Sequence, residues 1–297
     1  MKIVVTIPVY NEEETIGGVI DGVKKQASGL SSDYKIIVVD DGSTDKSPEI
    51  AKKHGAAVYC HPRNYGLAET FRTEVEKAVK EKPDIIVHID ADGQYDVGDI
   101  PRLIEPIKNG EAELVLGSRF LGKIEDMSFL KRQGNRAFSS VISHMTKTKI
   151  TDAQTGFRAF TRNVAQKLSI KSRHTYTQEM VIRASREKFR IKEIPVNFSR
   201  RESGKSRLIS NPFGYAARAW LNILRIYRDY EPLKFFGSIG AVLIGIGILL
   251  SVYIIVLLFT QGMSIIDQRI PTILVNMLFY VSGIQILCFG FLADRKV

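Results

Sequence analysis

Cysteine, tryptophan and, towards one end, charged residues are scarce in this chain of 297 residues. The two cysteines, Cys60 and Cys288, supply neither a disulfide framework nor a zinc site, which is typical of a reducing compartment. We expect no secretory signal at the N-terminus, because MKIVVTIPVYNEEE leads directly into a strand and an acidic turn. The polar part of the chain is therefore expected to stay in the cytoplasm.

Charge is almost absent after residue 237. Residues 238–260 and 270–292 contain no charged side chain, and each run exceeds the roughly 20 residues that cross ~30 Å of hydrocarbon. The alternative is a buried helix hairpin in a soluble protein, but core helices seldom run this long without a charge. The sequence therefore predicts two transmembrane helices.

The basic residues that flank these two runs predict their orientation. The loop between the runs offers only Arg269, beside Asp267. Basic residues are more frequent on the outer flanks: Arg218, Arg225, Arg228 and Lys234 before the first run, and Arg295 and Lys296 after the second. We therefore expect both termini and the polar body on the cytoplasmic side of a cell membrane or an endoplasmic-reticulum-type membrane.

The formal net charge of +10 lies almost entirely in the polar body. Such a body beside a membrane is attracted to anionic headgroups or to an anionic substrate. Nucleic acid is the other usual partner of a basic protein, but the sequence has no recognition motif and no run of basic residues interleaved with aromatics. We therefore expect a membrane and an anionic small molecule as partners, and no nucleic acid.

Short apolar runs alternate with amphipathic stretches over the first 120 residues. The strand candidates span residues 2–10, 34–41, 56–61, 84–92 and 112–120, and the helix candidates span residues 13–27, 46–55, 67–82 and 99–110. This alternation predicts an α/β fold with a mostly parallel, doubly wound sheet. Ligands bind such sheets at the carboxyl ends of the strands, where the sequence places PVYNEE, DDGSTD, DADGQYD and GSRF.

Two common nucleotide-binding motifs are missing. The G-x-G-x-x-G of a dinucleotide-binding fold would follow the first strand, but the turn here reads YNEEE, which is acidic where a phosphate would bind. The P-loop motif is missing as well. Any nucleotide is therefore held by other means.

The segment Asp90-Ala91-Asp92 ends the fourth predicted strand and is followed by Gln94. Alternation along an extended backbone directs both carboxylates towards one ligand, and the Gln94 amide adds a neutral oxygen. Such oxygens suit Mg²⁺ or Mn²⁺, which usually completes its shell with water and substrate phosphates. The motif alone is also consistent with a solvated acidic turn. Its neighbours at the same edge favour a metal-bridged diphosphate.

Further polar groups are expected to face that metal site. Asp40 and Asp41 end the second predicted strand, and the turn after them offers hydrogen-bonding side chains to a base or ribose; Ser43 alternatively caps the next helix. Arg119 ends the fifth strand, where its guanidinium suits phosphate oxygens. The facing wall is expected to consist of Pro8, Tyr10, Asn11 and Glu12.

Five motifs, in this order and spacing, resemble family 2 of the glycosyltransferases, whose members have the GT-A fold. They are PVYNEEETI, VVDDGSTD, NYGLAETFR, DADGQYDVGDIP and VLGSRF, and the resemblance covers residues 1 to about 208. It implies that Asp92 and Gln94 bind the metal, that Asp90 contacts the donor sugar or ribose, and that Arg119 completes the catalytic group. The metal is then expected to neutralise charge on the departing nucleoside diphosphate. The implied nucleoside-binding residues are Pro8, Tyr10, Glu12, Asp40, Asp41 and Ala91.

The second half of the polar body resembles one group within that family, the polyprenyl-phosphate hexose synthases, which include the dolichol-phosphate mannose synthases. The resemblance rests on FLKRQGNRAFS, TDAQTGFRAF and residues 175–208, and the two apolar runs fit the two-span members of the group. Lys131 is an alternative to Arg132 in the phosphate-binding set. The residues implied to lie near the donor and acceptor phosphates are Arg119, Arg132, Arg136, Arg201 and Lys205, with Arg207 nearby.

A phosphate-monoester acceptor accounts for these basic residues, because charge-assisted hydrogen bonds are roughly twice as strong as neutral ones. Its attacking oxygen is already ionised near pH 7, so no strong general base is required. We therefore expect a single in-line displacement with inversion at the anomeric carbon and no covalent intermediate. The sequence leaves the donor open among GDP-mannose, UDP-glucose and UDP-N-acetylglucosamine, and the lipid open between dolichyl and undecaprenyl phosphate.

Three regions are expected: a catalytic domain in residues 1–210, an interfacial region in residues 211–237 and a pair of transmembrane helices in residues 238–297. Between residues 211 and 232, apolar and aromatic residues recur at helical spacing with arginines opposite. This pattern suits a helix in the membrane interface or, alternatively, one packed on its own domain. Gly237, Ala241 and Gly245 recur every four residues, which favours close contacts between spans and a homo-oligomer.

Some features favour other interpretations. Many related sequences have an apolar residue and a histidine where this chain has Gly93 and Tyr95, a change expected to affect sugar or acceptor contacts. His88 alternates within a buried strand and is interpreted as structural. A processive polysaccharide synthase of the same fold is an alternative, but the sequence lacks its Q-x-x-R-W motif and further spans. A non-catalytic scaffold that binds nucleotide-sugar is another, disfavoured because the acidic and basic site residues are intact.

Overall fold

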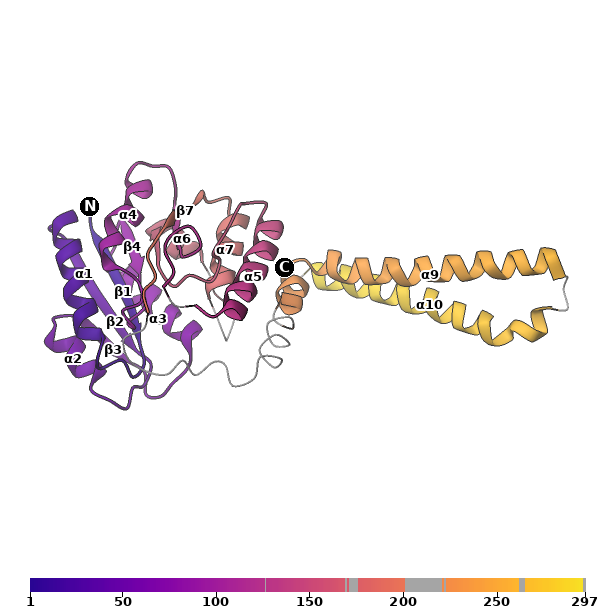
Figure 1. Cartoon of the computed structure of the whole chain (residues 1–297), viewed down its shortest axis with the longest axis horizontal. Helices are drawn as coiled ribbons and strands as arrows, with labels where there is room; N and C mark the ends of the chain where they lie inside the picture. Colours follow the sequence, from indigo (N-terminus) through magenta and orange to yellow (C-terminus); the bar gives the residue numbers. More distant parts are fainter. Residues whose placement is uncertain are drawn as a thin grey trace. The chain divides into compact units, whose positions relative to one another are not determined.

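The computed structural model describes residues 1–125, 127–168, 170, 176–200, 221, 223–261 and 265–295. The chain forms two compact units, Met1–Ser210 and Asn211–Val297. The first contains a sheet with helices on both faces, and the second contains two long helices (Figure 1).

A seven-stranded sheet forms the centre of the first unit. Its strands are β1 (Ile3–Val9), β2 (Tyr34–Asp40), β3 (Ala57–Cys60), β4 (Ile85–His88), β5 (Leu114–Ser118), β6 (Arg158–Thr161) and β7 (Ile191–Pro195). Their order across the sheet is β3-β2-β1-β4-β6-β5-β7. All neighbours are parallel except β6, which is antiparallel to both β4 and β5. The predicted mostly parallel α/β sheet is therefore confirmed, and β6 is an antiparallel strand within it.

Helices cover both faces of this sheet (Figure 1). They are α1 (Ile16–Leu30), α2 (Ser47–Lys53), α3 (Leu67–Lys80), the 3-10 turn η1 (Val97–Asp99), α4 (Ile100–Lys108), α5 (Phe129–Thr146), α6 (Arg162–Lys167) and α7 (Thr177–Arg186). The buried side chains of α1 recur every three or four residues, so they form one apolar face that packs on the sheet. Burying one such side chain fully contributes about 1.5–3 kcal/mol.

The strands next to the site are continuous β-branched runs, which suit a sheet covered on both sides. Ile3, Val5 and Ile7 of β1 share one buried cluster with residues of α1 and α4. On the other face, Phe71 of α3 contacts the side chain of His88 in β4, at 5.3 Å between ring centroids. Because both faces of β1 and β4 are packed, the carboxyl ends of these strands are held in fixed positions.

The second unit contains α9 (Pro232–Gln261) and α10 (Ile265–Asp294) after a helical segment at residues 223–230. Spans of 29 and 26 residues, Pro232–Thr260 and Arg269–Asp294, have mean hydropathies of 3.0 and 1.9 and are long enough to cross a membrane. Only 6% and 17% of their most apolar stretches are buried, which argues against a soluble core hairpin. α9 begins at Pro232, so residues 232–237 continue into the first span. Residues 211–220 of the expected interfacial region lie outside the described residues.

The two long helices approach closely through glycines. A Cβ atom added to Gly240 would lie 2.8 Å from the carbonyl oxygen of Gly283. Gly245, in contrast, has no atom within 4 Å of its Cβ position. Glycine at residue 240 is therefore used within the helix pair, and the expected contact between copies through the face of Gly245 stays a prediction.

Candidate active site

The loop after β1 and the loop after β2 are joined by side-chain to backbone hydrogen bonds. Asn11 has a φ of 55°, a left-handed conformation that asparagine tolerates. Its Oδ1 accepts from the Thr44 backbone N at 2.8 Å, and its own backbone N donates to Ser43 Oγ at 2.9 Å. Glu12 N donates to Ser47 Oγ at 2.8 Å. Ser43 therefore links the two loops, and α2 has no side-chain cap.

Most side chains expected to bind the nucleoside lie at this edge of the sheet. Tyr10 is 36% exposed, and Pro8 and Glu12 are half-buried. Asp40 is only 3% exposed, and its Oδ2 accepts a hydrogen bond from Ser43 N at 3.2 Å. The fold thus brings these residues together, and their contacts with a nucleoside stay a prediction.

Asp41 accepts hydrogen bonds from a neighbouring loop. Its carboxylate accepts from Tyr65 N at 2.9 Å and from Gly66 N at 2.8 Å, and it lies 2.8 Å from Nδ1 of His61. The other ring nitrogen of His61 lies 2.9 Å from Thr73 Oγ1. Asp41 therefore fixes the segment 61–66 that leads into α3, a role that its position at a strand end did not indicate.

The D-x-D loop, residues 89–96, follows β4 at the same edge of the sheet. Gly93 has a φ of +70°, which glycine adopts at little cost. The tight turn lets Gln94 N donate to Oδ1 of Asp92 at 3.1 Å. Thr15 Oγ1 donates to the carbonyl oxygen of the buried Ala91 at 2.8 Å. The D-x-D loop is thereby tied to the start of α1.

Residues 196–199, after β7, run along the D-x-D loop. Ser199 N donates to the Gln94 carbonyl oxygen at 2.8 Å, and Gln94 Nε2 donates to the Ser199 carbonyl oxygen at 3.2 Å. The second bond directs the side-chain nitrogen of Gln94 towards Ser199, and its side-chain oxygen, an acceptor, is the group suited to a cation.

Tyr95 is an internal anchor of the D-x-D loop. Its ring centroid lies 5.4 Å from that of Phe157 and 5.1 Å from that of Phe198. Its hydroxyl accepts from Gly156 N at 2.9 Å and lies 3.2 Å from Thr155 Oγ1, and burial raises the pKa of Tyr95 to about 12. Because Tyr95 is only 5% exposed, any effect on sugar or acceptor contacts is transmitted through the loop.

Asp90 lies between Gly156 and His88. A Cβ added to Gly156 would lie 2.0 Å from Oδ2 of Asp90, and Nε2 of His88 lies 3.9 Å from Oδ1. Burial, followed by repulsion from Asp92, raises the pKa of Asp90 to about 6, whereas His88 and Arg119 act in the opposite direction. Two carboxylates in this arrangement favour a cation between or beside them.

The oxygen ligands of the D-x-D loop fit a hard divalent cation. Asp92 supplies a carboxylate and Gln94 an amide oxygen, the ligand types that Mg²⁺ and Mn²⁺ prefer. Within the described ranges, no group of three or more histidine, cysteine, aspartate or glutamate side chains has a metal-binding arrangement. Water and substrate phosphates usually complete the shell of such a cation.

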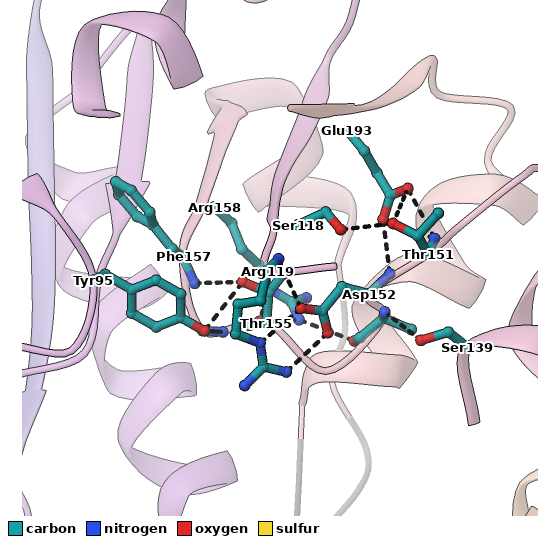
Figure 2. Close-up of polar contacts among 12 residues, drawn as sticks. Tyr95, Ser118, Arg119, Ser139, Thr151, Asp152, Thr155, Phe157, Arg158 and Glu193 are labelled. Atoms are coloured by element: carbon teal, nitrogen blue, oxygen red, sulfur yellow. Dashed lines mark hydrogen bonds and ion pairs between the residues drawn. The ribbon is translucent and has the colours of Figure 1, made fainter. Parts of the chain in front are cut away.

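Arg119, directly after β5, forms a buried ion pair with Asp152 (Figure 2). Nε of Arg119 lies 2.7 Å from Oδ2, Nη2 lies 2.8 Å from Oδ1, and the Arg119 backbone N donates to Oδ2 at 3.1 Å. Among the residues that the structure describes, Nη1 has no hydrogen-bond partner, so Nη1 and the second N–H of Nη2 are the donors suited to a phosphate oxygen. The expected phosphate contact of Arg119 is therefore limited to part of the guanidinium.

Glu193 of β7 holds the segment that carries Asp152 (Figure 2). Its carboxylate accepts from Thr151 N at 2.8 Å, from Asp152 N at 2.9 Å and from Thr151 Oγ1 at 2.9 Å. Burial raises the pKa of Glu193. Sequence reasoning assigned no role to either carboxylate. Asp152 lies in TDAQTGFRAF and Glu193 lies in residues 175–208, two segments that carry the resemblance, but no sequence pattern indicated which groups these carboxylates contact.

The structure describes some of the basic residues that are expected to bind phosphate. Arg132 and Arg136 are exposed and lie one turn apart on α5, and the Arg136 guanidinium lies 5.4 Å from the ring centroid of Phe120. Arg201 and Lys205 lie outside the described residues. The phosphate-binding role of all four stays a prediction.

The sequence of this chain is similar to those of known proteins. Residues 4–169 match the family model described as Glycosyl transferase family 2. The dolichyl-phosphate hexose transferase of Haloferax volcanii is 31% identical over 75% of this chain and 92% of its own length. The UDP-N-acetylglucosamine–dolichyl-phosphate N-acetylglucosaminyltransferase of Methanococcus voltae is also 31% identical, over 64% of this chain and 82% of its own length.

A solved structure shares the fold. It is the glucosyl-3-phosphoglycerate synthase of Mycobacterium tuberculosis in complex with Mn²⁺, uridine diphosphate and phosphoglyceric acid. The TM-score is 0.56 over 76% of this chain and 77% of that chain, at 21% sequence identity, which shows a common GT-A architecture. The family match covers more than half of the sequence, and with this sheet it shows that the chain belongs to glycosyl transferase family 2.

Proposed function

We propose that this chain is a membrane-anchored inverting glycosyltransferase that moves a hexose from a nucleotide sugar to a polyprenyl phosphate. The observation that carries the proposal is the D-x-D loop at the carboxyl edge of a GT-A sheet, in a chain with two helices of membrane-spanning length. Two relatives are named as dolichyl-phosphate transferases, which supports a lipid phosphate as acceptor. The product is a lipid-linked sugar for glycan or protein glycosylation.

The nucleoside of the donor is proposed to bind between the loops after β1 and β2. Tyr10, half-buried Glu12 and the carboxylate of Asp40 lie there, and the diphosphate then extends towards the D-x-D loop and Arg119. The Methanococcus relative supports UDP-N-acetylglucosamine as the donor, and the Haloferax relative supports a hexose. The donor panel of the assay below therefore includes GDP-mannose, UDP-glucose and UDP-N-acetylglucosamine.

Mg²⁺ or Mn²⁺ is the proposed cofactor, with Asp92 and Gln94 as protein ligands. When bound, the cation would neutralise charge on the leaving nucleoside diphosphate. Asp90 is proposed to contact the donor sugar or ribose beside this site. Nη1 of Arg119 is proposed to donate to a phosphate oxygen, while Asp152 holds the rest of the guanidinium in place.

The acceptor phosphate is proposed to lie near Arg132 and Arg136, with Arg201 and Lys205 contributing. These cations hold an ionised oxygen in line with the anomeric carbon, so no side chain has to remove a proton from the nucleophile. The reaction is a single displacement, and an α-linked donor gives a β-linked product. Isolation of a covalent glycosyl-enzyme, or an α-linked product from an α-linked donor, would contradict this mechanism.

We propose that the three regions of the chain take different positions relative to the membrane. Residues 1–210 form the catalytic domain on the cytoplasmic side, and residues 211–237 contact the interface, although the helix of the first span already begins at Pro232. The remainder, residues 238–297, forms the transmembrane pair, so that both termini face the cytoplasm. This sidedness rests on the basic flanks of the two spans.

The proposed function is tested by sugar transfer with the full-length protein in detergent. The assay contains Mn²⁺ or Mg²⁺, a short polyprenyl phosphate and each radiolabelled donor in turn. We expect label to enter the lipid phase with one donor, and chelation or Asp92→Asn to lower the rate by at least about 100-fold, because a metal ligand is lost.

Asp96→Asn is the matched control for Asp92→Asn. It removes the same charge from the same loop, and asparagine retains an oxygen that accepts from Gly98 N, as Oδ1 of Asp96 does at 2.8 Å. We expect the control to retain activity within about threefold, because it changes no proposed ligand. Nucleotide binding without label transfer to lipid from any donor would reject the polyprenyl-phosphate acceptor.

A further inference from the structure

A buried polar chain lies behind Asp90. His88, two residues earlier on the same side of the extended backbone, is 0% exposed. Its Nδ1 lies 2.8 Å from Oε2 of Glu74 in α3, and its Nε2 lies 2.6 Å from the Tyr176 hydroxyl and 3.9 Å from Oδ1 of Asp90. The imidazole therefore lies between a carboxylate in the core and a carboxylate of the D-x-D motif.

Glu74 has little reason to be buried apart from this imidazole. Its side chain is 0% exposed, and over the described residues neither carboxylate oxygen accepts a well-directed hydrogen bond. An isolated buried carboxylate costs far more than a buried apolar side chain of the same size. The ring nitrogen of His88 at 2.8 Å is its compensating contact, so the two side chains act as one unit.

Aromatic rings fix the imidazole in this orientation. Phe71 stacks on Tyr176 with ring centroids 3.8 Å apart and an interplanar angle of 8°, and both rings contact His88 edge-on. Tyr176 is also 0% exposed. In such a dry environment, electrostatic contacts are stronger than in water, and a rigid imidazole holds a neighbouring carboxylate more effectively than a mobile one.

We propose that the Glu74–His88 pair positions Asp90 for contact with the donor sugar. Gly156 lies against Oδ2 of Asp90 on one side, and Nε2 of His88 lies 3.9 Å from Oδ1 on the other, so the carboxylate is confined between them. His88 is thus a positioning residue that acts through Asp90, and this inference rests on the proposed function of the site.

The test uses His88→Gln, Glu74→Gln and the double variant in the full-length protein. With the accepted donor, we expect His88→Gln to lower kcat at least about tenfold while the donor KM changes less than about threefold. Glu74→Gln should lower kcat in the same direction, and the double variant should be no worse than the more impaired single variant, because the two residues act as a unit. Thermal unfolding identifies the folded fraction, and activity is expressed per folded protein.

A binding measurement separates this inference from the proposed function. Calorimetry with Mn²⁺ compares a nucleoside diphosphate with its nucleotide sugar, UDP with UDP-N-acetylglucosamine and GDP with GDP-mannose. We expect His88→Gln to weaken nucleotide-sugar binding about fivefold or more relative to the diphosphate, because this inference places the sugar, which the diphosphate lacks, against Asp90. Equal weakening of both ligands would place the contact on the ribose and overturn the inference. If wild-type protein transfers nothing to lipid, the proposed acceptor fails, yet this ratio still reports on Asp90.

Tyr176→Phe is the matched control within the cluster. It removes the other partner of His88 Nε2 and keeps Glu74, His88 and Asp90, so we expect kcat within about threefold of wild type. Unchanged kcat and binding ratio in both glutamine variants, with only a lower melting temperature, would overturn the inference. So would additive losses in the double variant. Should His88→Gln fail to fold, the isosteric Glu74→Gln carries the same comparison alone.

Discussion

Nε and Nη2 of Arg119 face Oδ2 and Oδ1 of Asp152 at 2.7 and 2.8 Å, in a bidentate ion pair at the edge of the proposed diphosphate site. Asp152 is 0% exposed, and Arg119 is 6% exposed. The pair is anchored from behind, because Glu193 accepts hydrogen bonds from the backbone of the segment that carries Asp152. In a guanidinium fixed in this way, Nη1 and the second N–H of Nη2 are the donors left for a ligand.

Asp152→Asn is expected to destabilise the catalytic unit and to reduce sugar transfer. Removal of one partner leaves a buried guanidinium without its counter-charge, which costs about 3 kcal/mol or more. Urea unfolding in detergent measures the change in the free energy of unfolding. Glu111→Gln, which removes an exposed carboxylate 2.6 Å from Lys192, is the control and should leave both stability and activity unchanged. Equal stability of the two variants would show that the Arg119 pair is not a structural element of the site.

Gly156→Ala is expected to displace Asp90 and to lower kcat by at least about tenfold, since the new methyl group overlaps the carboxylate. Gly18→Ala is the control, because its added Cβ meets no atom within 4 Å. Replacing a glycine inside α1 should stabilise the protein by about 0.5–1 kcal/mol and leave transfer unchanged. Steady-state kinetics and thermal unfolding compare the two. Wild-type kcat in Gly156→Ala would show that the position of Asp90 does not limit the reaction.

Local sequence patterns predicted the parallel part of the sheet because β1, β2 and β4 are continuous β-branched runs. They did not predict β6, whose four residues RAFT pair on both sides with strands far away in the sequence. Strand propensity in so short a segment depends on its neighbours in the folded sheet. The antiparallel strand between β4 and β5 was therefore visible only in the structure.

The same limit applies to the site. Strand ends predicted that Asp40 and the D-x-D carboxylates would meet at one edge of the sheet, because the carboxyl ends of parallel strands share that edge. They did not predict which hydrogen bonds each carboxylate accepts, so the hydrogen bonds that Asp41 accepts from the segment 61–66 were missed. The partnership of Glu74 with His88, and of Asp152 with Arg119, depends on tertiary packing for the same reason.

Asp41→Asn is expected to raise the donor KM about tenfold with a smaller effect on kcat. Asparagine lacks the charge and one of the two acceptor oxygens that fix Tyr65 N and Gly66 N, so the segment 61–66 loses its order beside the nucleoside site. Limited proteolysis without nucleotide should then cut this segment faster than in wild-type protein. A raised KM without faster cleavage would instead indicate direct contact between Asp41 and the nucleoside.

The helix pair gives the last prediction. Gly240→Leu is expected to separate α9 from α10, because even a Cβ at this position would lie 2.8 Å from the Gly283 carbonyl oxygen. Thermal unfolding in detergent should show a lower melting temperature. Gly245→Leu is the control for the pair, since its Cβ position is open, and it should leave that temperature unchanged. Gly245→Leu also tests the predicted homo-oligomer. If copies of the chain contact one another through the face of Gly245, light scattering in detergent should detect a particle of smaller mass. An unchanged particle mass would reject that contact.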